Sequence, residues 1–143
     1  MNNDKYEALK LKNQLCFPLY AAAKEVVKKY TPALETLDLT YTQYIALMVL
    51  WEDDGLTVKV LGQKLFLDSG TLTPVLKSLE QKGYVTRRRA EDDERSVKIF
   101  LTEAGTVLKD KAISVPEKIS CCVNLSPEET KTLYALLYKI LNQ

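Results

Sequence analysis

Apolar residues recur every three or four positions along most of the chain, a spacing typical of helices that pack one face on a core. The first such segment predicts a helix over about 16–30, with Pro18 in its first turn. Thr31-Pro32 weakens or ends that helix. Thr40 and Gln43 then form a capping-box pattern, which predicts that a helix begins at the next apolar run.

Two helical segments follow this run. Thr57 caps a short helix predicted over 58–65. Asp68 or Ser69 caps the second, whose apolar residues recur at i, i+3, i+4 and i+7. Gly83 is the expected stop of that helix, because glycine readily adopts the left-handed conformation that ends helices.

The apolar period then changes from 3.6 to 2, which predicts strands over 84–89 and 96–101. The charged segment between them has the length of a hairpin loop. Two helical segments, about 102–120 and 126–141, follow the strands. The pattern therefore predicts a mainly α fold with a small β-hairpin wing.

A short helix, a tight turn, a second helix and a hairpin are the order of a winged helix-turn-helix, whose second helix enters the major groove of double-stranded DNA. We expect this unit over about 41–101, and dimerisation helices over about 5–35 and 102–143. Such readers usually bind the two half-sites of a pseudo-palindromic operator as homodimers. The predicted contacts from the second helix are Ser69, Gly70, Thr71, Thr73 and Lys77. The alternative for Ser69 is a cap with no DNA role.

Basic residues on the predicted wing give further candidate DNA contacts. They are Arg87, Arg88 and Arg89 on the first strand and Arg95 at the end of the loop. Four acidic residues over 91–94 would repel phosphates. We expect Asp93 to orient Arg95 through a charge-assisted pair, so that Arg95 enters a narrow minor groove. A solvated basic run is the alternative.

Composition narrows the chemistry. The formal charge of the 143 residues is only +1, so DNA contact depends on local basic clusters. The sequence has no histidine, no Cys-x-x-Cys pair and no glycine-rich phosphate loop, so we expect no metal, no cofactor and no nucleotide enzyme. We find no signal-peptide or membrane-spanning pattern. A cytoplasmic protein with three free thiols and no membrane partner is expected.

Three stretches resemble the MarR family of winged-helix repressors, and within it the organic-hydroperoxide sensors called OhrR. They are Asn13-Gln14-Leu15-Cys16-Phe17, the segment LFLDSGTLTP over 65–74, and Glu91-Asp92-Asp93-Glu94-Arg95. The resemblance extends over about 11–141. It implies a repressor that releases its operator when an organic hydroperoxide oxidises an N-terminal cysteine. Ser78 departs from the pattern, since relatives often carry arginine there, and this implies altered affinity for the DNA backbone.

Residue by residue, the resemblance implies that Cys16 is the sensing thiol and that Tyr30 and Tyr41 of the partner subunit hydrogen-bond its thiolate. It also implies the two-cysteine type, with an intersubunit disulfide from Cys16 to Cys121, or alternatively to Cys122. Other members of the OhrR branch rely on a small thiol instead. Apart from the resemblance, the positive end of a helix dipole favours a thiolate at Cys16. The alternatives are a Cys16 that is a small buried hydrophobe, and two later cysteines with no redox role.

The sequence thus predicts a dimeric DNA-binding repressor that senses organic hydroperoxides and is not an enzyme. Two alternatives stay open. One is a repressor of the same family that responds to a small ligand and has inert thiols. The other is a thiol-dependent peroxidase, which would have no use for the predicted recognition helix and wing.

Overall fold

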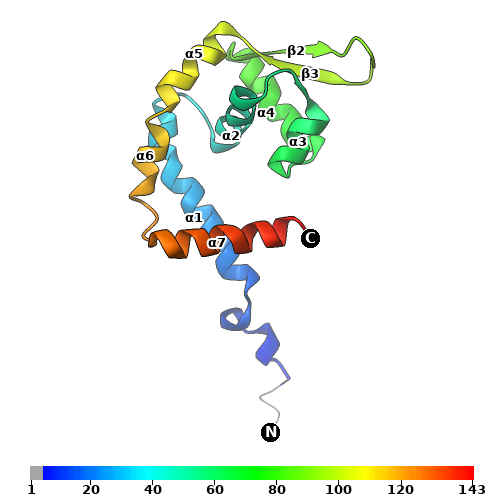
Figure 1. The fold of residues 1–143 in the computed structure, drawn as a ribbon. Helices are drawn as coiled ribbons and strands as arrows, with labels where there is room; N and C mark the ends of the chain where they lie inside the picture. The colour runs from blue at the N-terminus through cyan, green and yellow to red at the C-terminus, as the bar shows by residue number, and fades with distance from the viewer. Residues whose placement is uncertain (1–4) are drawn as a thin grey trace.

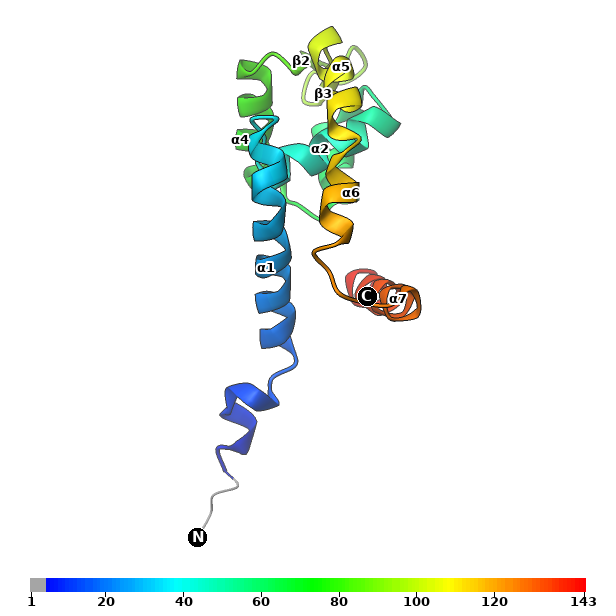
Figure 2. The same ribbon diagram turned by 90° about the vertical axis from the view of Figure 1, so that its left-hand side faces the viewer.

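A winged unit sits at one end of a long helix, α1 (Figures 1 and 2). The computed structural model describes residues 5–143. The winged helix-turn-helix architecture that the sequence predicts is confirmed. In chain order the elements are η1 (Glu7–Leu9), η2 (Leu11–Asn13), α1 (Cys16–Glu35), α2 (Tyr41–Glu52), β1 (Leu56–Thr57), α3 (Val58–Leu65), α4 (Ser69–Gln81), β2 (Val85–Arg89), β3 (Val97–Leu101), α5 (Glu103–Ala112), α6 (Val115–Ser120) and α7 (Pro127–Leu141).

Side-chain caps fix the starts of the helices where the sequence predicts them. Thr40 forms a full capping box with Gln43, and Thr57 accepts the backbone N–H of the third residue of α3. Asp68, rather than Ser69, caps α4. Each cap satisfies an N–H group that has no partner inside its helix. Gly83, with a φ of 80°, follows the end of α4 as expected.

The hairpin of β2 and β3 is confirmed, and a third strand joins it. The antiparallel sheet has the order β1-β3-β2, with Arg87 opposite Ile99. The third strand, β1, is only two residues long and pairs Leu56 with Ile99. The sequence does not predict it, because two residues carry no period and the strand forms only through pairing with β3.

Two predicted helix boundaries are wrong. First, α1 does not end near Thr31-Pro32 but continues to Glu35. Its last turn buries Ala33 and Leu34 in the core, and this burial outweighs the hydrogen bond that Pro32 removes. Second, the helix predicted over 102–120 is two helices, because α5 ends at Ala112 and α6 begins at Val115.

The core lies between α2, α3, α4 and the sheet. Its fully buried side chains are mainly leucines, among them Leu47, Leu61, Leu72 and Leu76, and they pack with Ile99 of β3. By contrast, none of the described residues 127–141 of α7 is buried. Figure 2 shows α7 standing apart from α1. No helix within residues 5–143 has the length and apolar character that a membrane crossing needs.

Candidate DNA interface and thiol site

The N-terminal turn of α4 presents small polar side chains to solvent. Asp68 Oδ1 accepts the backbone N–H of Thr71 at 2.7 Å, and Thr73 Oγ1 donates to the Ser69 carbonyl at 2.7 Å. Hydrogen bonds from Thr71 to the Asp68 carboxylate, chiefly through the Thr71 backbone and next through its side chain, hold the pKa of Asp68 below its usual range. Since Asp68 is the cap, the exposed Ser69 hydroxyl takes no part in capping.

Two further predicted positions on α4 are placed by the structure. Gly70 is exposed, and a Cβ there would lie 3.2 Å from Asp68 Oδ1, so the cap leaves little room for a side chain. Lys77 is exposed on the same helix. The first turn of α4 therefore offers hydroxyls and an exposed glycine backbone, and Lys77 adds a cation about two turns later. These are groups that contact phosphates and base edges.

Ser78, which departs from the family pattern, is half-buried and lies against α2. Its Oγ accepts a hydrogen bond of 2.9 Å from Nε2 of Gln43, which is buried. The Oε1 atom of Gln43 in turn accepts the backbone N–H of Thr40 at 3.0 Å. Ser78 thus satisfies a buried amide between α2 and α4. This is a structural role that the sequence does not indicate.

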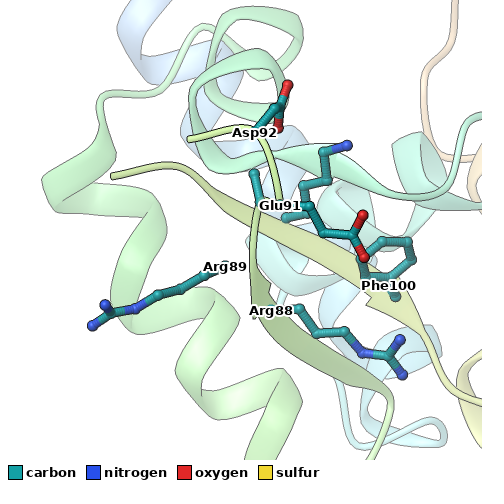
Figure 3. A pocket seen from close by; sticks show the side chains of 7 residues that line it. Arg88, Arg89, Glu91, Asp92 and Phe100 are labelled. Carbon is teal, nitrogen blue, oxygen red and sulfur yellow. The ribbon is translucent and has the colours of Figure 1, made fainter. Parts of the chain in front are cut away.

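The three consecutive arginines of β2 have different surroundings. Nε of Arg87 donates to Glu80 Oε1 at 3.1 Å, and its NH2 nitrogen lies 3.0 Å from the same oxygen. Arg88 lies over the ring of Phe100, 5.3 Å from the centroid. Figure 3 shows Arg88 and Arg89 pointing to opposite sides of the strand, with Arg89 directed away from Phe100. Of the three arginines, Arg89 therefore has the side chain most available to DNA.

The wing loop is held by Asp93, but not as predicted. Asp93 Oδ1 accepts the backbone N–H of Arg95 at 2.9 Å, and Oδ2 accepts the Ser96 hydroxyl at 3.1 Å. The ion pairs among residues 5–143 do not include one between Asp93 and the guanidinium of Arg95. Asp93 therefore fixes the backbone of the turn, and the exposed side chain of Arg95 is left to the solvent.

Cys16 is the first residue of α1, and its side chain is exposed within one subunit. Its expected tyrosine partners lie at the other end of the helix. Tyr30 follows Cys16 by fourteen helical residues, which corresponds to about 21 Å of helix length. Within one subunit these phenols cannot reach the Cys16 thiol.

The predicted tyrosine pair is brought together, and a third tyrosine joins it. The ring centroids of Tyr30 and Tyr41 are 4.9 Å apart, and Tyr44 lies 6.1 Å from Tyr30. Burial, and then the proximity of Tyr30, raises the pKa of Tyr41 above its usual range, and the same two causes raise the pKa of Tyr44. Both phenols therefore keep their proton at neutral pH and can donate it. The spacing of Tyr41 and Tyr44, three residues apart on one helix, is a signal that could have identified the third tyrosine.

Cys121 and Cys122 lie in the turn after α6, not on a helix, and their sulfurs are 3.9 Å apart. The two thiols therefore lie side by side in this turn. Hydrogen bonding with Cys121, followed by desolvation, raises the pKa of the Cys122 thiol. Lys29 Nζ donates to the Cys122 carbonyl at 2.5 Å, which joins this turn to α1.

The position of this contact places the cysteines far from Cys16 of the same subunit. Lys29 is thirteen helical residues beyond Cys16, which corresponds to about 20 Å. A disulfide needs Cα atoms less than about 7 Å apart. In this conformation, neither Cys121 nor Cys122 can therefore pair with Cys16 of its own subunit.

A short helix, a turn, an exposed second helix and a basic hairpin wing define the class of winged helix-turn-helix DNA-binding proteins. Residues 28–112 match the family model described as transcriptional regulator SarA/Rot. The chain belongs to the MarR/SarA family of winged helix-turn-helix transcriptional regulators, and it is not an enzyme.

Similar proteins include regulators and solved DNA complexes. The organic hydroperoxide resistance transcriptional regulator of Bacillus subtilis is 52% identical over 96% of this chain and 94% of its own length. The regulator SarZ of Staphylococcus aureus is 48% identical over 86% of this chain and 83% of its own length. AbfR, known from Staphylococcus epidermidis, has been solved in its reduced form bound to DNA, with 38% identity, 96% coverage of both chains and a TM-score of 0.78. Its disulfide form, also 38% identical, covers 99% of this chain and 97% of that one with a TM-score of 0.62.

Proposed function

We propose that this protein is a cytoplasmic homodimeric repressor that senses organic hydroperoxides through Cys16. In its reduced form it binds a pseudo-palindromic operator. The Cys16 thiolate attacks the peroxide oxygen, which yields a sulfenic acid on the protein and an alcohol. The oxidised dimer then changes conformation and releases the DNA. The similarity to a hydroperoxide resistance regulator and to redox forms of AbfR supports this assignment.

The observation that carries the proposal is the placement of Cys16 relative to the tyrosine cluster. The exposed thiol begins α1, whereas Tyr30 and Tyr41 lie near the other end of that helix. An antiparallel pairing of two α1 helices would bring Cys16 of one subunit to the tyrosine cluster of the other. Phenol donors stabilise a thiolate, so this arrangement favours the reactive form of the sensor.

Apolar side chains exposed on α1 and α7 support the dimer. Among the described residues, the end of the chain that carries Cys16 exposes Leu15 and Phe17, and α7 exposes Leu133 and Leu136. Exposed apolar surface of this kind marks a site of contact with another protein surface. Two copies that cover these helices would also space two winged units for two half-sites.

The DNA contacts of this proposal are Ser69, Gly70, Thr71, Thr73 and Lys77 of α4, and Arg88, Arg89 and Arg95 of the wing. Arg87 and Asp93, also predicted as contacts, have structural partners in the described chain and act by holding the wing in place. The overall similarity is greater to reduced, DNA-bound AbfR than to its disulfide form, which supports the view that the described conformation is the one that binds DNA.

We further propose that the sulfenic acid is resolved by a thiol of the partner subunit, with loss of water. Neither Cys121 nor Cys122 can reach Cys16 of its own subunit in this conformation, which supports a resolving thiol from the partner subunit. Cys121 is the first candidate because it is exposed, and Cys122 is the second. Non-reducing gels of peroxide-treated protein should show a crosslinked dimer in the wild type, and no such dimer once the resolving cysteine is replaced by serine. A wild-type protein that runs only as monomer under these conditions would contradict the disulfide.

The test of the whole function is DNA-binding anisotropy on the operator region, before and after cumene hydroperoxide and again after dithiothreitol. Binding should be lost with peroxide and regained with reductant, and Cys16→Ser should stay bound throughout. Oxidation must stabilise the released conformation over the DNA-binding conformation by about 5.5 kcal/mol to move the DNA-binding form from dominant to rare. If binding is indifferent to peroxide, or if Cys16→Ser still responds, the sensor is not Cys16.

A further inference from the structure

The adjacent cysteines after α6 form a dithiol with unusual surroundings. Their sulfurs lie 3.9 Å apart, and both approach the carbonyl oxygen of Lys118, Cys121 at 3.2 Å and Cys122 at 3.6 Å. The resolving reaction uses only one of the two thiols. The structure therefore leaves a second thiol unexplained, close enough to its neighbour that one small atom can bridge both sulfurs.

We propose that Cys121 and Cys122 bind a trivalent arsenic species, with both sulfurs as ligands. In this reaction arsenous acid exchanges two hydroxyl groups for two sulfurs: As(OH)₃ + 2 RSH gives (RS)₂AsOH + 2 H₂O. Two As–S bonds form, two As–O bonds break, and the thiol protons leave in the water. Nothing is oxidised or reduced. Thiolate sulfur is a soft ligand and suits a soft centre of this kind.

The number of donors argues against the common metal ions. Across residues 5–143, no group of three or more histidine, cysteine, aspartate or glutamate side chains could hold a metal ion, and the sequence has no histidine. A structural zinc site takes four protein ligands, so two thiols fall short. Trivalent arsenic needs only three bonds, and a hydroxyl group can supply the third.

The charge near the pair also favours a neutral ligand. A hollow of about 260 Å³ between α1 and α6 borders Cys122 and is lined by Lys29 and Lys118. Two lysines repel a divalent cation and have no such effect on uncharged arsenous acid. A divalent ion must displace the thiol protons, whereas arsenous acid carries its own hydroxyl groups to accept them.

The test is native mass spectrometry of the reduced protein with sodium arsenite, together with a count of free thiols. We expect one arsenic per subunit and a fall from three free thiols to one. Cys121→Ser and Cys122→Ser should each lose the adduct, and Cys16→Ser should keep it. Uptake should be the same at mildly acidic and at neutral pH, and zinc should give no adduct under the same conditions. Circular dichroism of the variants checks that they are folded.

Several outcomes would overturn the proposal. One is an adduct that survives in either Cys121→Ser or Cys122→Ser, and another is an adduct that requires Cys16. Zinc bound as readily as arsenite would show a general metal site. Phenylarsine oxide, which has two exchangeable positions on arsenic, is a second probe and should react with the same two residues.

Arsenic binding by Cys121 and Cys122 does not depend on the proposed function, but its effect on the oxidation of Cys16 rests on that function. A pair that holds arsenic has no free thiol to resolve oxidised Cys16. Arsenite-loaded protein treated with cumene hydroperoxide should therefore form no intersubunit disulfide, while dimedone still labels its Cys16 sulfenic acid. If the protein takes up no arsenic from arsenite and still forms the crosslink with cumene hydroperoxide, the arsenic site alone is overturned. Arsenic uptake by a protein whose Cys16 is never oxidised would overturn the sensor alone.

Discussion

Three arginines of identical chemistry occupy consecutive positions on β2, yet their neighbours give each a different role. Arg87 is bound by Glu80, and Arg88 lies against Phe100. Arg89 is exposed and points away from both Arg88 and Phe100 (Figure 3). An arginine whose donors are already used has less to offer a phosphate. The DNA contribution of the wing strand should therefore come mainly from Arg89.

This difference predicts distinct effects of two alanine substitutions. Arg89→Ala should weaken binding to all DNA sequences and reduce the slope of log affinity against log salt by about one, the value for one lost phosphate contact. Arg87→Ala is the matched control and should change that slope less, because its main partner is Glu80. Fluorescence anisotropy at several salt concentrations measures both. Equal slopes for the two variants would contradict the separation of roles.

At the scale of elements, a carboxylate clamp joins α4 to β2. Glu80 near the end of α4 accepts the backbone N–H of Arg87 at 3.0 Å and also binds its guanidinium. These hydrogen bonds hold the pKa of Glu80 below its ordinary value of 4.5, with the side-chain bond as the largest cause. The clamp fixes the wing against the helix that we expect to enter the major groove.

The lowered pKa gives a pH dependence of definite sign. A carboxylate with a depressed pKa stabilises the folded state above its unfolded value and loses that contribution as the pH falls through the folded value. On acidification from about pH 6 to about pH 3, the wild type should therefore lose more unfolding free energy than Glu80→Gln. Urea denaturation across this range measures the effect. Arg87→Ala removes the guanidinium but keeps the backbone N–H, so in that background Glu80→Gln should have a smaller effect on the pH dependence. An undiminished effect there would rule out the Arg87 side chain as its cause.

The elements also divide into those that local chemistry predicts and those that it does not. The caps at Thr40 and Thr57 depend on residues within one turn, so the sequence alone identifies them. The continuation of α1 past Pro32 and the strand β1 depend on burial and pairing with distant residues. Those interactions exist only in the folded chain, and local patterns cannot reveal them.

The same division holds for the candidate site. The exposed start of α4 and the position of Cys16 follow from helix boundaries, and the sequence predicts both. The backbone role of Asp93 and the inward orientation of Ser78 do not follow, because each depends on which atom a side chain meets in space. The 3.9 Å approach of the two later sulfurs depends likewise on a turn that helical periodicity does not describe.

At the scale of the whole molecule, α7 is a helix with an apolar face that the rest of the described residues 5–143 leaves unburied. Leu133 lies near the centre of that face, and Ala135 lies on the opposite side of the helix, two residues later. If a second subunit covers α7, a charge in place of Leu133 destabilises the dimer far more than a charge in place of Ala135, because only Leu133 is buried in the dimer.

Leu133→Glu should therefore convert the dimer to a monomer and weaken operator binding by at least about tenfold, which corresponds to about 1.4 kcal/mol. Ala135→Glu adds the same charge to the same helix and should leave both properties unchanged. Light scattering after size exclusion gives the mass, and anisotropy gives the affinity. A Leu133→Glu protein that remains dimeric would remove α7 from the interface.

The break between α5 and α6 divides the chain into a part that packs on the winged unit and a part that packs on α1. A joint at this position lets the angle between the two parts change without unfolding either helix. In the function proposed above, operator DNA with fixed half-site spacing stabilises one angle, and the proposed intersubunit disulfide stabilises another. By thermodynamic linkage, the factor by which oxidation lowers the DNA affinity equals the factor by which bound DNA lowers the equilibrium constant for disulfide formation. Occupied operators should therefore hold their repressor reduced at peroxide levels that already oxidise the free protein.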